Sequence, residues 1–120
     1  MEYIRIICQI IIALGIFNVW ILRYGKPTDW RASGAQNMQQ EFKAYGLPEW
    51  FMYLIGFLKL LFAVLLILGI WVPELVNPAA IGMAILMIGA IAMHIKVSDP
   101  LKKALPAFTM LVLSVIVIIL

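Results

Sequence analysis

Long apolar segments alternate with short polar segments along this chain. Each apolar segment approaches the roughly 20 residues that an α-helix needs to cross the hydrocarbon core of a bilayer. Two of the three connections are only a few residues long, so the segments that they join must pack antiparallel. The pattern predicts an all-α fold, an integral membrane up-down four-helix bundle, built as one domain over residues 1–120. The predicted spans are residues 6–22, 51–72, 75–95 and 100–120.

The first connection is long and carries a helical pattern of its own. Its apolar positions recur at helical spacing among polar ones. Ser33 and Gln36 fit a capping box, and Gly46 with the following Leu-Pro pair is a helix stop. We therefore predict a short amphipathic helix over residues 34–45, on the membrane surface or in the mouth of the bundle. It serves either as a lid or only as a linker. Its apolar positions are Ala35, Met38, Phe42 and Tyr45.

Composition supports a membrane environment. The chain is 65% hydrophobic and 12% charged, whereas soluble domains are about 45–50% apolar and 25% charged. The partner that this composition requires is a lipid bilayer. The net charge of +3 is small and forms no basic stripe, so nucleic acid is not an expected partner. The single cysteine, Cys8, leaves no intrachain disulfide or CxxC pair.

The basic residues are distributed unevenly between the two sides of the predicted bundle. Those in or beside the first and third connections are Arg23, Lys26, Arg31, Lys43, Lys96, Lys102 and Lys103, and the other side has only Arg5. By the positive-inside rule the first and third loops lie in the cytoplasm and both termini lie outside. Three tryptophans, Trp30, Trp50 and Trp71, are expected near the membrane interfaces.

Lys59 is the only charged residue in the apolar segment 51–72. A cation inside such a span costs about 2.5–3.5 kcal/mol on insertion scales, so it should face protein or water rather than lipid. Lys59 shares a helix face with the small residues Gly56 and Ala63, and such faces allow membrane helices to pack closely. Two roles stay open: a structural pin bonded to backbone carbonyls, or a group that binds a ligand or transfers a proton.

Depth in the predicted bundle places further polar residues beside Lys59. Asn18 lies near the first-loop end of its segment, and His94 near the third-loop end of its own; both loops are on one side. His94 lies on a different helix face from Gly82 and Gly89, so it points either into the bundle or toward a neighbouring subunit or the headgroups. No set of His, Cys and carboxylate residues has metal-ligand spacing, so no metal site is predicted. The candidate ligand-binding residues are Lys59, His94, Asn18, Glu41 and Asn37.

Several stretches resemble the DoxX-like family across nearly the whole chain. They are GAQNMQQEF (34–42), YGLP (45–48), GFLKL (56–60), LGIW (68–71) and MHIKVSDP (93–100). The resemblance implies a small four-span protein of the bacterial cytoplasmic (inner) membrane. It also implies a link to the membrane subunit of thiosulfate:quinone oxidoreductase and to complexes with soluble redox partners. Many relatives have an acidic residue where this chain has Lys59, which is a departure from the family's Gly-x-x-Glu pattern.

Three functions follow as hypotheses. The first is a membrane subunit of a quinone-linked redox system, with a quinone near Lys59. The chain lacks a haem-ligand pair, a cysteine cluster and a dinucleotide motif, so it has no complete catalytic apparatus and a soluble partner would supply electrons. The second is a non-enzymatic carrier or binding protein for a lipid or hydrophobic metabolite. The third is a scaffold subunit. A homodimer through the glycines of segment 75–95 is compatible with each.

Overall fold

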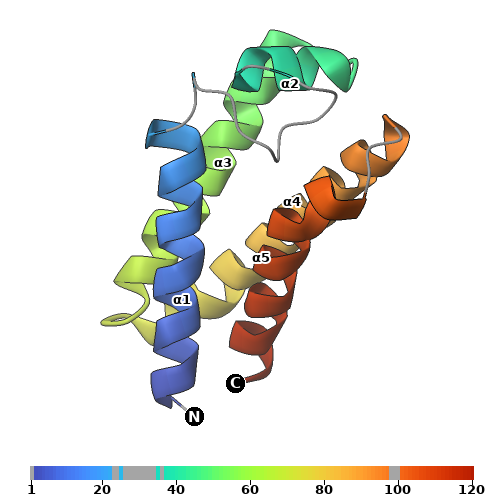
Figure 1. The fold of residues 1–120 in the computed structure, drawn as a ribbon. Helices are drawn as coiled ribbons and strands as arrows, with labels where there is room; N and C mark the ends of the chain where they lie inside the picture. The colour runs from blue at the N-terminus through green and yellow to red at the C-terminus, as the bar shows by residue number, and fades with distance from the viewer. Residues whose placement is uncertain (1, 23–24, 26–34, 36, 98–100) are drawn as a thin grey trace.

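The protein is helical throughout the residues that its computed structural model describes, which are 2–22, 25, 35, 37–97 and 101–120 (Figure 1). This confirms the predicted all-α class. A π-helical turn, η1 (Asn18–Leu22), continues α1, and a short 3-10 turn, η3 (Pro73–Leu75), precedes α4. The α-helices are α1 (Glu2–Phe17), α2 (Met38–Ala44), α3 (Glu49–Leu68), α4 (Val76–Lys96) and α5 (Leu101–Ile119).

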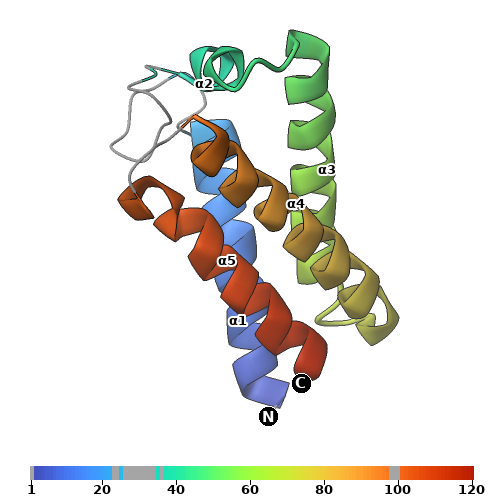
Figure 2. The same cartoon turned by 90° about the vertical axis from the view of Figure 1, so that its right-hand side faces the viewer.

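The four long helices pack around a common apolar core. Helices α4 and α5 form the most extensive pair, α1 packs against α3 and α5, and α3 also packs against α4. Both termini lie at one end of the molecule, and α2 lies across the start of α3 at the other end (Figures 1 and 2). Two contacts fix the spacing of the helices. The buried Gln9 side chain donates to the Leu66 carbonyl (2.7 Å), and the Phe62 ring covers Gly82.

The long helices match a membrane environment. Three stretches of the described chain are long and apolar enough to cross a bilayer. The apolar part of α5, Lys103–Ile119, is shorter. Large apolar side chains are exposed along the outer faces, among them Leu14, Phe57 and Ile85, and an exposed apolar face of this extent requires lipid or another protein. The protein is therefore a membrane protein. The three long stretches are Glu2–Leu22, Glu49–Leu68 and Pro73–Lys96.

Two helix boundaries differ from the sequence prediction. Helix α3 ends at Leu68 rather than at residue 72, because the chain turns at Gly69 and the N–H groups of Ile70 and Trp71 bond only three residues back. Helix α2 begins at Met38 rather than at residue 34, because Asn37 is its N-cap. The capping-box residues Ser33 and Gln36 lie outside the described residues, and so does Asp99, the N-cap that the sequence predicts for the span 100–120.

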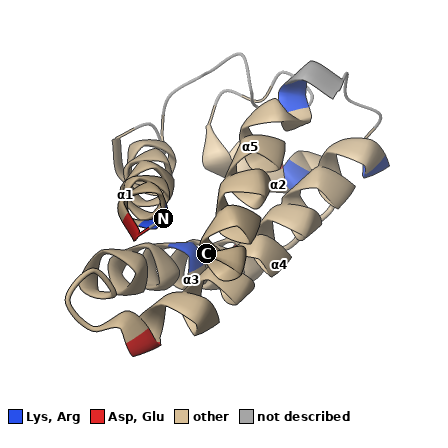
Figure 3. Cartoon of the chain, turned by 90° about the horizontal axis from the view of Figure 1, so that it is seen from below, with Lys and Arg blue, Asp and Glu red and all other residues tan. Residues whose placement is uncertain are grey.

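Charged residues interrupt the described helices at only a few places (Figure 3). Lys43 and Lys96 lie at the end that carries α2, where α2 itself and the end of α4 meet. The opposite end carries Glu2 and Arg5 near the start of α1 and Glu74 in the turn before α4. This difference agrees with the unequal distribution of basic residues in the sequence.

Candidate functional site

Lys59 faces protein at the α2 end of the molecule. It lies in α3 and is partly buried, and its ammonium nitrogen is 5.5 Å from the centroid of the Trp20 ring. That distance is within the roughly 6 Å at which a cation is attracted to an aromatic face. Trp20 therefore supplies an electrostatic partner for a cation that lipid could not stabilise.

Trp20 reaches this position through two local features. The α-helical path of α1 gives way at Asn18 to the wider π-helical turn, and Trp20 is buried within that turn. Its ring lies against Gly56 of α3, where a Cβ atom would stand only 2.5 Å from Trp20 Cζ3. The absence of a side chain at Gly56 thus leaves room for the ring. Single π-helical turns inside α-helices often occur at functional sites.

Four buried rings continue from Lys59 toward the membrane surface, and we call them the aromatic cluster: Trp20, Phe42, Tyr45 and His94. The centroids of Trp20 and Phe42 are 6.0 Å apart, and those of Phe42 and Tyr45 are 5.7 Å apart. The Tyr45 and His94 rings follow at 6.0 Å. All three pairs meet edge to face, the arrangement that aromatic quadrupoles favour. The aromatic cluster thereby joins η1, α2 and α4.

A carboxylate lies beside the aromatic cluster. Glu41 is only 9% exposed, and its Oε1 accepts a hydrogen bond of 2.9 Å from the Tyr45 hydroxyl. The charge of Glu41 also acts favourably on the Lys59 ammonium. The site thus combines one basic and one acidic side chain of opposite charge.

Helix α2 is held over the site at both of its ends. At its start the Asn37 side chain accepts from the Gln40 N–H (2.8 Å). At its end Gly46 has a positive φ of 79°, and the N–H groups of Gly46 and Leu47 bond back into the helix in a Schellman arrangement. Lys96 of α4 donates to the Tyr45 carbonyl at 2.9 Å. A cation at a helix C-terminus also complements the helix dipole.

The structure brings three of the five candidate residues together. Lys59, Glu41 and His94 all contact or act on the aromatic cluster. His94 is 6% exposed, on the same buried face of α4 as Met83 and Met87, so the alternative that it points outward is wrong. Asn37 caps α2. Asn18 is exposed where the π-helical turn begins, so its predicted burial is wrong.

Sequence reasoning missed the rings around Lys59. Phe42 and Tyr45 were visible as the apolar face of the predicted loop helix, and that face is buried as expected. Nothing in the sequence distinguished Trp20 from the other apolar residues of its segment. Glu41 lies among the polar positions of the predicted loop helix, yet it is buried, and the Tyr45 hydroxyl donates to it.

The arrangement suits a flat, uncharged, polar-edged molecule. Aromatic rings offer surfaces for stacking, the ammonium of Lys59 offers a hydrogen-bond donor, and a carboxylate such as Glu41 offers an acceptor. In the described part of the chain, no group of three His, Cys, Asp or Glu side chains has the geometry of a metal site.

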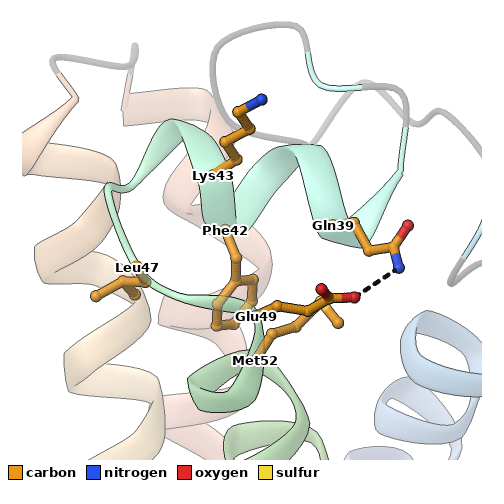
Figure 4. A pocket seen from close by; sticks show the side chains of 6 residues that line it. All are labelled: Gln39, Phe42, Lys43, Leu47, Glu49 and Met52. Carbon is orange, nitrogen blue, oxygen red and sulfur yellow. Dashed lines mark hydrogen bonds between the residues drawn. The ribbon is translucent and has the colours of Figure 1, made fainter.

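A separate hollow lies between α2 and the start of α3, with a volume of about 360 Å³ (Figure 4). Its floor is apolar and its rim is polar. Phe42 belongs both to the wall of this hollow and to the aromatic cluster. We call it the outer hollow, and its lining residues are Gln39, Phe42, Lys43, Leu47, Glu49 and Met52.

Comparison with known proteins gives one match. A family model described as the DoxX-like family matches residues 30–117. The match covers α2, α3 and α4 and most of α5, and therefore includes Glu41, Lys59 and His94 but not Trp20. No curated protein and no solved structure matches the chain.

Proposed function

The chain belongs to the DoxX-like family, and from this premise we propose that it is a membrane subunit of a quinone-linked redox system. In this proposal the quinone headgroup binds beside Lys59 and the aromatic cluster. One observation carries the proposal: a lysine ammonium within a long apolar helix lies against the Trp20 ring, at the same end as Glu41 and His94. A cation is rarely kept in such a segment unless it has a function.

The charges near the aromatic cluster favour a neutral ligand. Lys59 donates to a carbonyl oxygen of the quinone, and the Glu41 carboxylate accepts from a hydroxyl group of its reduced form. In this proposal the headgroup enters between the helices and contacts the apolar rings of the aromatic cluster, which are buried when no ligand is bound. Because the nearby Glu41 carboxylate repels a second negative charge, an anionic headgroup gains less at this site than at an isolated lysine. This supports a quinone over an anionic amphiphile, the ligand of the alternative carrier function.

A soluble partner supplies the electrons in this proposal. The sequence contains one histidine and one cysteine, too few for a bis-histidine haem or a cysteine-ligated cluster. The end that carries α2 is the docking side, because Lys43 and Lys96 lie there and the aromatic cluster is closest to it. The partner therefore presents an acidic face.

We also propose the arrangement in the membrane. Helices α1, α3, α4 and α5 cross the cytoplasmic (inner) membrane of a bacterium as an up-down bundle, with the α2 side in the cytoplasm. The lengths of three of these helices and the distribution of basic residues support this. A homodimer would use the face of α4 around Gly89, where no atom lies within 4 Å of an added Cβ, whereas Gly82 is covered by Phe62.

Fluorescence of Trp20 tests the proposed site. In a variant with Trp30, Trp50 and Trp71 replaced by phenylalanine, a quinone bound beside Lys59 should quench Trp20 saturably at micromolar concentration. A matched variant that keeps only Trp71, at the far end of α3, should show the weak, unsaturated quenching of a quinone dissolved in detergent. Equal, unsaturated quenching in both variants would refute the quinone site. A change in Trp20 fluorescence that saturates with a fatty acid but not with a quinone would support the carrier function instead.

A further inference from the structure

The outer hollow lies at the depth of lipid headgroups. Glu49 on its rim is the first residue of α3, one of the helices long enough to cross a bilayer. The next residue, Trp50, is 66% exposed, as expected of an indole ring at the membrane interface. The volume of about 360 Å³ falls within the roughly 300–1,000 Å³ of small-molecule sites. The hollow and the lipid headgroups therefore lie at the same level of the membrane, and a headgroup can enter the hollow directly.

Two hydrogen bonds hold the Glu49 carboxylate in place, and both go to the same oxygen. Its Oε1 accepts from Gln39 Nε2 (3.2 Å) and from the Tyr53 hydroxyl (3.1 Å). Among the described residues no donor bonds to the other carboxylate oxygen, Oε2. Figure 4 shows the hydrogen bond from Gln39 on one carboxylate oxygen and the second oxygen directed away from Gln39. A fixed carboxylate with a free oxygen at the rim of an apolar hollow selects a cationic hydrogen-bond donor.

The other lining residues define the rest of the ligand. Phe42, Leu47 and Met52 form an apolar floor. Covering this floor with an acyl chain is favourable because it removes apolar surface from water. Lys43 also lines the hollow, but Figure 4 shows its side chain directed away from Glu49, over the other side of α2. A ligand in the hollow thus meets the Glu49 carboxylate and an apolar floor, and the flexible, exposed Lys43 side chain has to turn toward the hollow to reach it. A ligand that complements these groups carries an ammonium, a phosphate and acyl chains in one molecule.

We propose that the outer hollow binds an ethanolamine phospholipid. Its primary ammonium donates to Glu49 Oε2, its phosphate pairs with Lys43, and the start of its acyl chains lies on Phe42, Leu47 and Met52. A choline lipid has the same charges but no N–H to donate. A glycerol lipid has the phosphate but no cation for Glu49. The inference shares only Phe42 with the proposed quinone site, and its selective contact, at Glu49, does not involve Lys59, so the two proposals can fail separately.

Native mass spectrometry of the protein in vesicles with equal parts of ethanolamine, choline and glycerol phospholipid tests this site. The wild type should retain the ethanolamine lipid about tenfold over the choline lipid, the lower end expected for a hydrogen bond to a charged group. Glu49→Gln should abolish that preference, and Glu74→Gln, an exposed acid at the opposite end, should keep it. Retention of the ethanolamine lipid by Glu49→Gln as by wild type would overturn the proposal.

A second measurement uses only the wild-type protein, so it does not depend on how a variant folds. Retention should fall stepwise when the ethanolamine headgroup is replaced by its monomethyl, dimethyl and trimethyl forms, because each step removes an N–H donor while the charge stays. Equal retention across this series, or equal retention of the glycerol lipid, would show that Glu49 does not select the headgroup and would overturn the proposal.

Discussion

The Lys59 ammonium lies 5.5 Å from the centroid of the Trp20 ring, and this contact joins α3 to the π-helical turn at the end of α1. The cation comes from a segment that is otherwise apolar, and the ring comes from a second such segment. A lone lysine in an apolar span is energetically unfavourable, and Trp20 alone is an ordinary apolar residue of its segment. Together they form a cation–aromatic contact surrounded by apolar side chains. The proposed ligand site depends on this contact and on the aromatic cluster that continues from it.

Gly56 controls the position of Trp20. We expect Gly56→Ala to destabilise the protein by about 1–3 kcal/mol, the range for overpacking, because the new Cβ would stand 2.5 Å from Trp20 Cζ3. The displaced ring should also change its fluorescence and weaken quinone binding. Thermal unfolding in detergent and the Trp20 quenching assay measure the two effects.

Gly82→Ala is the matched control for Gly56→Ala. Its Cβ would meet the Phe62 ring at the same distance of 2.5 Å, so the loss of stability should be similar. Because Phe62 does not belong to the aromatic cluster, quinone affinity should stay at the wild-type value. If both variants lose affinity equally, the loss follows from general instability and Trp20 has no special role.

Two tyrosine–glutamate hydrogen bonds of the same spacing differ in burial. Tyr45→Phe leaves the buried Glu41 carboxylate with one donor fewer, and we expect a loss of about 1–3 kcal/mol of unfolding free energy. Tyr53→Phe removes the same kind of bond to the exposed Glu49, where water replaces the hydroxyl, so the loss should stay within about 0.5 kcal/mol. Equal losses in the two variants would contradict the burial of the Glu41–Tyr45 pair.

Lys59 and Glu41 should be energetically coupled. A double-mutant cycle with Lys59→Met and Glu41→Gln should give a coupling of about 0.5–3 kcal/mol, since each single change leaves the other charge without its partner. Unfolding in mixed micelles provides the four free energies. The control cycle combines Lys59→Met with Glu74→Gln and should be additive within about 0.5 kcal/mol. Additivity in both cycles would mean that Glu41 does not stabilise Lys59.

Lys96 fastens the end of α2 to α4. Lys96→Met removes the donor to the Tyr45 carbonyl, so the amides of the last turn of α2 should exchange hydrogen roughly two- to fivefold faster, as expected for a lost cation at a helix C-terminus. Lys96→Arg keeps a cationic donor and should exchange as wild type does. Hydrogen exchange read by mass spectrometry over residues 38–47 checks both. An unchanged rate in Lys96→Met would show that this bond does not hold α2.

The helices could be predicted from the sequence because long apolar segments separated by polar connections are a strong signal. The sequence identified Lys59 because a single charge in an apolar segment is conspicuous, and depth arguments brought His94 near it. The burial of Phe42 and Tyr45 followed from helical spacing alone.

The remaining features depend on tertiary contacts that periodicity does not encode. The π-helical turn shifts the register of α1, so Asn18 is exposed while Trp20 is buried. Glu41, on the polar side of the α2 sequence, is buried, and Tyr45 on the next turn donates a hydrogen bond to it. Helix α3 ends before three further apolar residues, Ile70, Trp71 and Val72, because the chain turns at Gly69.

The most direct test of the proposed function is mass spectrometry of the small molecules that copurify with the protein from native membranes in a mild detergent. We predict that the wild type and Glu74→Gln retain a quinone, and that Lys59→Met, which removes the ammonium but keeps a flexible apolar side chain, retains about tenfold less. Equal amounts of quinone in wild type and Lys59→Met, or none in either, would contradict the proposal that Lys59 and the aromatic cluster form a quinone site.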